Sequence, residues 1–164
     1  MNPPTVFNGN FVVVDTMVII NFHSLLALEK LINWARGEIV IERRVKIEAD
    51  SSLAGKIDLE PYIQNNLVIE EEIRSEEQEE LFYHYFSRRP GKTVMHKGEA
   101  ACLALAISKG YGLACDEKAV RDEFRKKCPD RICIHSWGIV DKANDLGLVE
   151  ENEAKWLKKG FYYV

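Results

Sequence analysis

Short apolar runs alternate with longer stretches of helical periodicity from one end of the chain to the other. The short runs are rich in Val, Ile and Leu and lie beside turn-forming residues, which is typical of buried strands. They predict strands at residues 11–16, 38–41, 66–69, 112–116 and 131–134. The longer stretches predict helices at residues 17–35, around 45–48, and at 70–86, 98–109, 117–127, 136–145 and 150–159.

This alternation predicts an α/β fold, a three-layer α/β/α sandwich with a central parallel sheet. Parallel neighbours need crossover connections, and these connections are usually helical. The chain has 164 residues, which suits one such core and is short for two independent cores. No linker or internal repeat is visible, so we expect a single domain spanning residues 1–164.

The apolar runs are too short for a membrane span, which needs roughly 20 apolar residues. The first residues carry no cationic cluster, and the apolar stretch that follows is interrupted by Asp15, so a signal peptide is not predicted. We therefore expect a cytoplasmic protein without a membrane partner. The cysteines lack paired zinc-ligand spacing and are expected to be reduced core or near-surface thiols: Cys102, Cys115, Cys128 and Cys133.

The net charge of −4 argues against a nucleic-acid partner at first sight, because phosphate binding is normally driven by surplus Lys and Arg. A metal ion would neutralise several acids, however, and the basic residues are locally clustered. Each cluster is either a solvated helix face, the usual role of a charge run, or a phosphate-binding patch. The clusters are Arg43, Arg44 and Lys46; Arg88, Arg89, Lys92 and Lys97; and Arg121, Arg125, Lys126 and Lys127.

Acidic residues follow two of the predicted strands. Asp15 closes the first strand, Asp116 closes the fourth, and Glu99 opens the apolar helix between them. In a parallel sheet, the carboxyl ends of strands open into one crevice. Taken singly, each acid also has a structural explanation, because Asp caps helices and Glu is favoured in a first helical turn.

Taken together, the acids predict a divalent-cation site. Several carboxylates at one partly buried edge repel one another unless a cation is present. Mg²⁺ and Mn²⁺ prefer oxygen ligands and suit a site made of carboxylates. Such ions polarise phosphoryl oxygens, so chemistry on phosphodiesters follows.

Five segments that together span most of the chain carry a family pattern. They are residues 12–16 (Val-Val-Val-Asp-Thr), 45–48 (Val-Lys-Ile-Glu), 98–106 (opening Gly-Glu-Ala), 113–117 (Leu-Ala-Cys-Asp-Glu) and 135–148 (opening His-Ser-Trp-Gly). These segments resemble the PIN-domain family, the metal-dependent ribonuclease fold that includes VapC-type toxins. The last segment is similar to the closing segment of an archaeal and bacterial subgroup with a Gly-Glu-Ala helix.

The resemblance implies hydrolysis of RNA with Mg²⁺ or Mn²⁺. One or two ions would be held by Asp15, Glu48, Glu99 and Asp116. Thr16 would orient Asp15 or a water on the metal. The acid at the end of the fourth strand is not fully assigned, because Asp116 acts either alone or with Glu117 or Asp122. Ahead of Glu99, His96 or Lys97 would contact a substrate phosphate, with a plain surface role as the alternative.

Family relatives of the toxin type pair with an antitoxin and form dimers, so the resemblance implies an RNA substrate, an antitoxin partner and a homodimer. The competing hypothesis is a non-catalytic PIN-like module that interacts with a nucleic acid or a protein, its acidic crevice being occupied by a partner's arginine or its set of acids being incomplete. Phosphate-binding loops of the P-loop type are not predicted, because residues 91–93 imitate the motif's end while Phe86 occupies the position of its first glycine.

Overall fold

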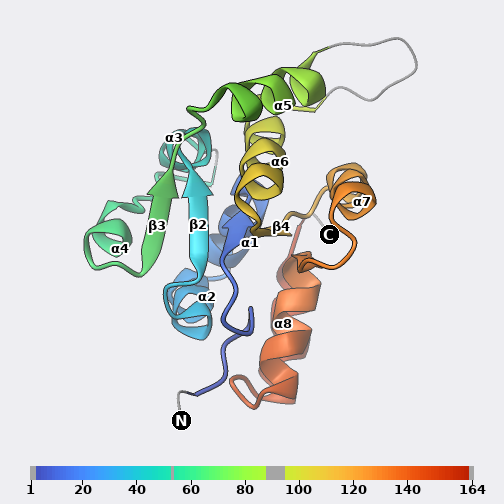
Figure 1. The fold of residues 1–164 in the computed structure, drawn as a ribbon. Coiled ribbons are helices and arrows are strands. Elements are labelled where there is room, and N and C mark those ends of the chain that lie inside the picture. The colour runs from blue at the N-terminus through green and yellow to red at the C-terminus, as the bar shows by residue number, and fades with distance from the viewer. Residues whose placement is uncertain (1–2, 53, 88–94, 163–164) are drawn as a thin grey trace.

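The computed structural model describes residues 3–52, 54–87 and 95–162, in which strands and helices alternate (Figure 1). In chain order the elements are β1 (Val12–Val14), α1 (Thr16–Ser24), α2 (Leu28–Ala35), β2 (Ile39–Glu42), α3 (Arg43–Asp50), α4 (Glu60–Gln64), β3 (Val68–Glu71), α5 (Glu76–Phe86), α6 (Lys97–Lys109), β4 (Gly112–Ala114), α7 (Lys118–Lys127), β5 (Cys133–Ile134), α8 (Ser136–Asp145) and α9 (Glu151–Gly160).

The strands form one parallel sheet in the order β3-β2-β1-β4-β5. Strand β1 is central, and its Val12 lies opposite Ile39 of β2 and Gly112 of β4. The valines of β1 are fully buried, as expected for β-branched residues in a strand that is covered on both faces. The predicted α/β fold with a central parallel sheet is confirmed.

Helices cover both faces of the sheet. The connections from β1 through β2 to β3 run toward one edge, whereas those from β3 through β4 to β5 run toward the other edge. Since crossover connections are right-handed, opposite directions place their helices on opposite faces. In Figure 1, α6 crosses the near face of the sheet and α1 lies behind it. The three-layer α/β/α arrangement is therefore confirmed as well.

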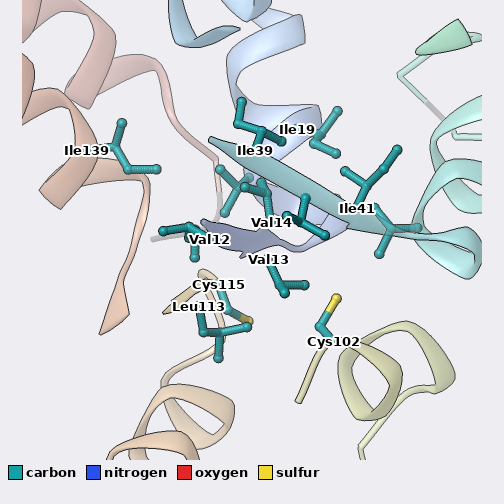
Figure 2. Close-up of a cluster of buried hydrophobic side chains, with 14 of the residues drawn as sticks. Val12, Val13, Val14, Ile19, Ile39, Ile41, Cys102, Leu113, Cys115 and Ile139 are labelled. Carbon is teal, nitrogen blue, oxygen red and sulfur yellow. The ribbon is translucent and has the colours of Figure 1, made fainter. Parts of the chain in front are cut away.

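Cysteines contribute to the core next to the central strand. Figure 2 shows Val13 of β1 pointing toward the side of the sheet that holds Cys102 of α6 and Cys115. Both of these thiols are fully buried, and all four cysteines are free, as the sequence predicted. The core thus extends directly to the residues that flank Asp15.

The prediction of one helix over residues 17–35 is wrong, because this segment folds as α1 and α2. Helix α1 ends where Leu26 takes a left-handed backbone (φ 57°), and the N–H groups of Leu26 and Ala27 donate to the carbonyls of His23 and Phe22. These two bonds form a Schellman-type helix end. Glycine is the usual residue at such a position, so leucine gave no signal of the break.

The boundaries predicted around the third strand are also wrong. Glu70 and Glu71 belong to β3 rather than to a helix. Helix α5 begins later, after Ser75, whose hydroxyl oxygen accepts from the Gln78 backbone N–H while the Gln78 side chain accepts from the Ser75 N–H. This reciprocal capping box sets the start of the helix. The short helix α4 was not predicted, and β5 is shorter than the predicted strand.

Among the described residues, no helix is long and apolar enough to cross a membrane. The predicted basic cluster at Arg88, Arg89 and Lys92 and the excluded phosphate-loop imitation at residues 91–93 lie outside the described residues. Lys97, the fourth member of that cluster, is described: its ammonium lies 5.7 Å from the centre of the Phe86 ring.

Candidate active site

Asp15 stands at the carboxyl end of the central strand. Its backbone N–H donates to the Ala114 carbonyl (2.9 Å), so β1 and β4 remain paired up to this point. Although Asp15 is the N-cap residue of α1, its side chain makes no capping hydrogen bond. The helix-cap interpretation therefore does not account for this carboxylate.

The Asp15 carboxylate is buried among weak donors. Only 3% of the residue is exposed, and its two oxygens lie 3.7 Å from the Cys102 sulfur and 3.6 Å from the Cys115 sulfur. Burial raises the pKa of both thiols well above the ordinary value, with the charge of Asp15 adding to the effect, so both sulfurs act as S–H donors.

Burial also raises the pKa of Asp15, to about 7, because desolvation penalises the charged form. The backbone N–H of Thr16 opposes this shift, while the negative charges of Glu99 and Glu48 add to it. Asp15, Glu48 and Glu99, which we call the acid cluster, are therefore close enough to repel one another. A carboxylate in this condition gains most from a nearby cation.

Glu48 reaches the same place from helix α3. It is half-buried, and its Oε2 accepts a hydrogen bond of 2.5 Å from the Thr16 hydroxyl. A methyl group built at Gly98 would lie 2.6 Å and 2.7 Å from the two Glu48 carboxylate oxygens. Glu48 thus rests against the first turn of α6 where only glycine leaves room. The Thr16 side chain, expected to orient Asp15 or a water on the metal, donates to Glu48, and its part in orienting a metal ligand stays a prediction.

Glu99 joins the cluster from the first turn of α6. Its Oε2 accepts from the His96 backbone N–H (3.0 Å), so Glu99 does close the helix start, as the structural explanation proposed. Burial raises the pKa of Glu99 in addition, and the charges of Glu117 and Glu48 raise it further. The Glu99 side chain therefore both caps the start of α6 and belongs to the acid cluster.

Asp116 is held by three strong donors. Asn21 of α1 donates to Oδ2 (2.7 Å), and Ser136 of α8 donates its N–H to Oδ1 and its hydroxyl to Oδ2, each at 2.6 Å. Asp116 is 8% exposed, so these donors replace lost hydration. The Asn21 Oδ1 in turn accepts the N–H of Tyr162 (3.1 Å).

Sequence reasoning missed Asn21 as a partner of Asp116 and treated Ser136 only as part of a family segment. The available signal for Asn21 was an amide side chain inside an otherwise apolar helix, where a buried polar group requires a partner. The sequence did not say which partner, because Asn21 and Asp116 are 95 positions apart.

The two additional acids differ in their surroundings. Glu117 is exposed, but its charge contributes to the raised pKa of Glu99, so it lies within electrostatic range of that carboxylate. Asp122 pairs with Lys118 (2.6 Å), which lowers the pKa of Asp122. The largest causes of the raised pKa of Asp15 and of Glu99 do not include the charge of Asp122. The part of either acid in a metal site stays a prediction.

The donors of the acid cluster fit a hard divalent cation in kind. In the described part of the chain, no three carboxylate, imidazole or thiol side chains stand close enough, as placed, to hold one ion. The hydrogen bonds found there use Oε2 of Glu48 and Oε2 of Glu99, which leaves the Oε1 atom of each carboxylate for a ligand. Oxygen donors and the repulsion on Asp15 both favour Mg²⁺ or Mn²⁺.

The hold of Ser136 on Asp116 leads to a stability prediction. Ser136→Ala removes one buried hydrogen bond to a carboxylate and should lower the free energy of unfolding by about 1–2 kcal/mol. Urea unfolding measures the loss. Ser24→Ala is the matched control, because its exposed hydroxyl donates only to the Ile20 carbonyl, and it should change stability by less than about 0.5 kcal/mol. Equal effects of the two variants would show that Ser136 does not stabilise Asp116.

Comparison with known proteins gives one finding. A family model described as a PIN domain matches residues 11–159 of the chain, which includes all the acids described above. Searches of curated proteins and of solved structures returned no match.

Proposed function

The chain belongs to the PIN-domain family, and we propose that it is a Mg²⁺- or Mn²⁺-dependent endoribonuclease that hydrolyses RNA phosphodiester bonds. The observation that carries this proposal is the burial of Asp15 within repulsive range of Glu48 and Glu99, which raises its pKa to about 7. Folding brings these acids together from β1, α3 and α6 at an energetic cost, and a cation would remove that cost.

In the proposed enzyme, Asp15, Glu48, Glu99 and Asp116 would hold the ion or ions, with Glu117 at the rim. When bound, such an ion polarises a phosphoryl oxygen and lowers the pKa of water. The remaining work falls to the chain itself, which fixes the carboxylates before the ion and the substrate arrive. Fixed ligands keep the reorganisation needed for catalysis small.

Three side chains do this orienting work, those of Thr16, Asn21 and Ser136. The Thr16 hydroxyl fixes Glu48 through Oε2, and Gly98 allows that carboxylate to rest against α6. On the other side, Asn21 and Ser136 fix Asp116. The first set of contacts joins α1, α3 and α6, and the second joins α1 and α8 through Asp116 at the carboxyl end of β4.

Protonation of Asp15 would couple metal binding to pH. With a pKa near 7 in the metal-free protein, this carboxyl is about half protonated at neutral pH. A ligand must be deprotonated, so uptake of a cation would release a proton. Affinity for Mn²⁺ should therefore rise as the pH rises through 7.

We further propose that the protein is the toxin of a toxin–antitoxin pair and acts on RNA in the cytoplasm as a homodimer. The support is the resemblance of the chain to the PIN-domain family, which includes VapC-type toxins, together with the similarity of its closing segment to that of an archaeal and bacterial subgroup with a Gly-Glu-Ala helix. Co-purification with the product of an adjacent short gene, and release of nuclease activity when that product is removed, would test the pairing.

One observation favours a second candidate, a PIN-like module that binds a nucleic acid or a protein without cleaving it. Both oxygens of Asp116 are engaged by Asn21 and Ser136, and among the described residues no three ligands are grouped closely enough for an ion. The two candidates differ in a simple assay.

The assay uses the purified full chain with end-labelled single-stranded and structured RNA in Mg²⁺, Mn²⁺ or EDTA. We expect cleavage with either ion, none in EDTA, and none with Glu99→Gln, provided that circular dichroism shows this variant to be folded. Glu99→Gln keeps an oxygen that can accept from His96 but loses the charge. Wild-type protein that cleaves no RNA with either ion would decide in favour of the binding module.

A further inference from the structure

An exposed indole is fixed at the residue that follows Ser136, the partner of Asp116. Trp137 directly follows Ser136, whose N–H and hydroxyl both donate to the Asp116 carboxylate. Although Trp137 is 44% exposed, its indole N–H donates to the Lys158 carbonyl of α9 (3.0 Å), so the ring is held in one orientation. A large apolar surface that is both exposed and fixed is prepared for contact with a ligand.

A positive charge that forms no ion pair within the described part of the chain lies on the neighbouring helix. Arg121 of α7 is half-buried, and its Nη1 donates to the carbonyl of Cys115 (2.9 Å), the residue before Asp116. Among the described residues no carboxylate forms an ion pair with Arg121, whereas Lys118 and Arg125 of the same helix both pair with Asp122. The charge of Arg121 therefore remains available to an anion.

His135 connects the guanidinium and the indole. Burial lowers the pKa of His135, and the positive charge of Arg121 lowers it further, so Arg121 lies within electrostatic range of this imidazole. The rings of His135 and Trp137 are 6.5 Å apart between centres. Arg121 is therefore within electrostatic range of His135, whose ring neighbours that of Trp137, and Arg121 itself contacts the residue before Asp116.

We infer that Arg121 and Trp137 form a nucleotide subsite for single-stranded RNA, the Arg121–Trp137 subsite. The guanidinium takes a backbone phosphate and the indole stacks on a base. This inference rests on the proposed function, because it assigns the substrate's path past the acid cluster.

The chemistry of the two side chains selects this ligand. A guanidinium offers a fork of donors that matches phosphate oxygens, and an aromatic face stacks on any base. Within a duplex the bases are stacked on one another and do not reach an indole on the protein surface, so an unpaired strand is required. The positive charge of Arg121 also offsets the repulsion that the acid cluster exerts on RNA.

The test measures binding in EDTA, where cleavage does not contribute. The probe is a fluorescein-labelled single-stranded RNA octamer of mixed sequence, followed by anisotropy with the full chain. Trp137→Ala should weaken binding about tenfold, and Trp137→Phe, which keeps an aromatic face, should bind within about threefold of wild type. Arg121→Gln should also weaken binding about tenfold and flatten the dependence on salt.

Trp156→Ala supplies the matched control. Trp156 is 58% exposed on α9, and it lies two residues before Lys158, about 200° around the helix from it. This variant should bind the octamer as wild type does. An abasic octamer of the same length should bind wild type and Trp137→Ala equally.

The subsite is overturned if wild type does not bind the octamer, if Trp137→Ala binds it like Trp156→Ala, or if the abasic octamer binds wild type as tightly as the RNA does. Failure of the proposed function gives a different pattern: RNA binding in EDTA that depends on Trp137, without cleavage in Mn²⁺. A third outcome is also distinct. If the wild type cleaves RNA but substitution of Trp137 or Arg121 does not change the affinity for the octamer, the nuclease proposal stands and the subsite is refuted.

Discussion

Replacing Asp15 by asparagine is expected to stabilise the metal-free protein at neutral pH and to abolish its binding of Mn²⁺. Asparagine has nearly the same shape as aspartate but carries no charge, so the cost of desolvating a buried carboxylate disappears, together with the repulsion from Glu99 and Glu48. The same change removes the acid at the centre of the proposed metal site. RNA cleavage should fall at least about 100-fold.

The raised pKa of Asp15 should make the stability of the metal-free protein depend on pH. Asp15 has a pKa of about 7 in the folded protein, against an ordinary value of 3.8 that applies to the unfolded chain. Between these values the folded state holds the extra proton, so the free energy of unfolding decreases as the pH rises from about 4 to 7. At about 1.4 kcal/mol per pH unit, the full loss is on the order of 4 kcal/mol.

Urea unfolding in EDTA across this pH range measures the effect as the difference between wild type and Asp15→Asn. The difference should be small near pH 4 and grow in favour of the variant up to pH 7. Asp122→Asn is the control, because its carboxylate is paired with Lys118 and its pKa is lowered, so it should not reproduce the slope. Saturating Mn²⁺ should restore the stability of wild type above pH 7 and leave Asp15→Asn unchanged.

Parallel curves for wild type and Asp15→Asn would mean that Asp15 is already ionised in the folded protein near pH 4. The repulsion within the acid cluster would then be absent, and the main support for a cation site would be lost. Retained cleavage by Asp15→Asn would separately remove this residue from the chemistry.

The parallel sheet and the placement of Asp15 and Asp116 could be predicted because both depend on local pattern. A short β-branched run followed by an acid marks a strand and its carboxyl end, whatever the rest of the chain does. Glu99 was also readable, since it opens an apolar helix. To predict where these three acids lie, it was enough to know the order of the elements and that the carboxyl ends of parallel strands lie at one edge of the sheet.

The contacts that orient the acids were not readable from the pattern. Thr16 and Glu48 are 32 positions apart, and Asn21 and Asp116 are 95 positions apart, so each pair depends on how α1 packs against its neighbours. A polar side chain in an apolar helix shows that a partner exists but not where it lies. For Leu26 even this signal was missing, since its left-handed backbone has no glycine to mark it.

Glu48 could be predicted only in part, because its assignment came from the family resemblance alone. Its helix also carries Arg43, Arg44 and Lys46, so the sequence alone is equally compatible with an exposed ion pair. The structure instead gives Glu48 a hydrogen bond from Thr16 and a contact with Gly98. The contact with Gly98 offers a way to test Glu48 without changing any acid.

Gly98→Ala is expected to lower the affinity for Mn²⁺ and the rate of RNA cleavage by about ten- to 100-fold while the fold persists. The new methyl group would lie 2.6–2.7 Å from the Glu48 carboxylate oxygens, which is too close, and the carboxylate is the mobile end of its side chain. Glu48 would therefore turn away and lose its bond to Thr16. Alanine is a better helix former than glycine by about 1 kcal/mol, so stability should change little.

A double-mutant cycle with Glu48→Ala separates the effect on the site from the effect on the helix. In the Glu48→Ala background the methyl group meets no carboxylate, so Gly98→Ala should leave Mn²⁺ affinity unchanged and raise the free energy of unfolding by up to about 1 kcal/mol. Isothermal titration with Mn²⁺ and urea unfolding of the four proteins provide both readouts. If Gly98→Ala alone binds Mn²⁺ as tightly as wild type, the position of Glu48 does not matter to the ion, and Glu48 has no place among its ligands.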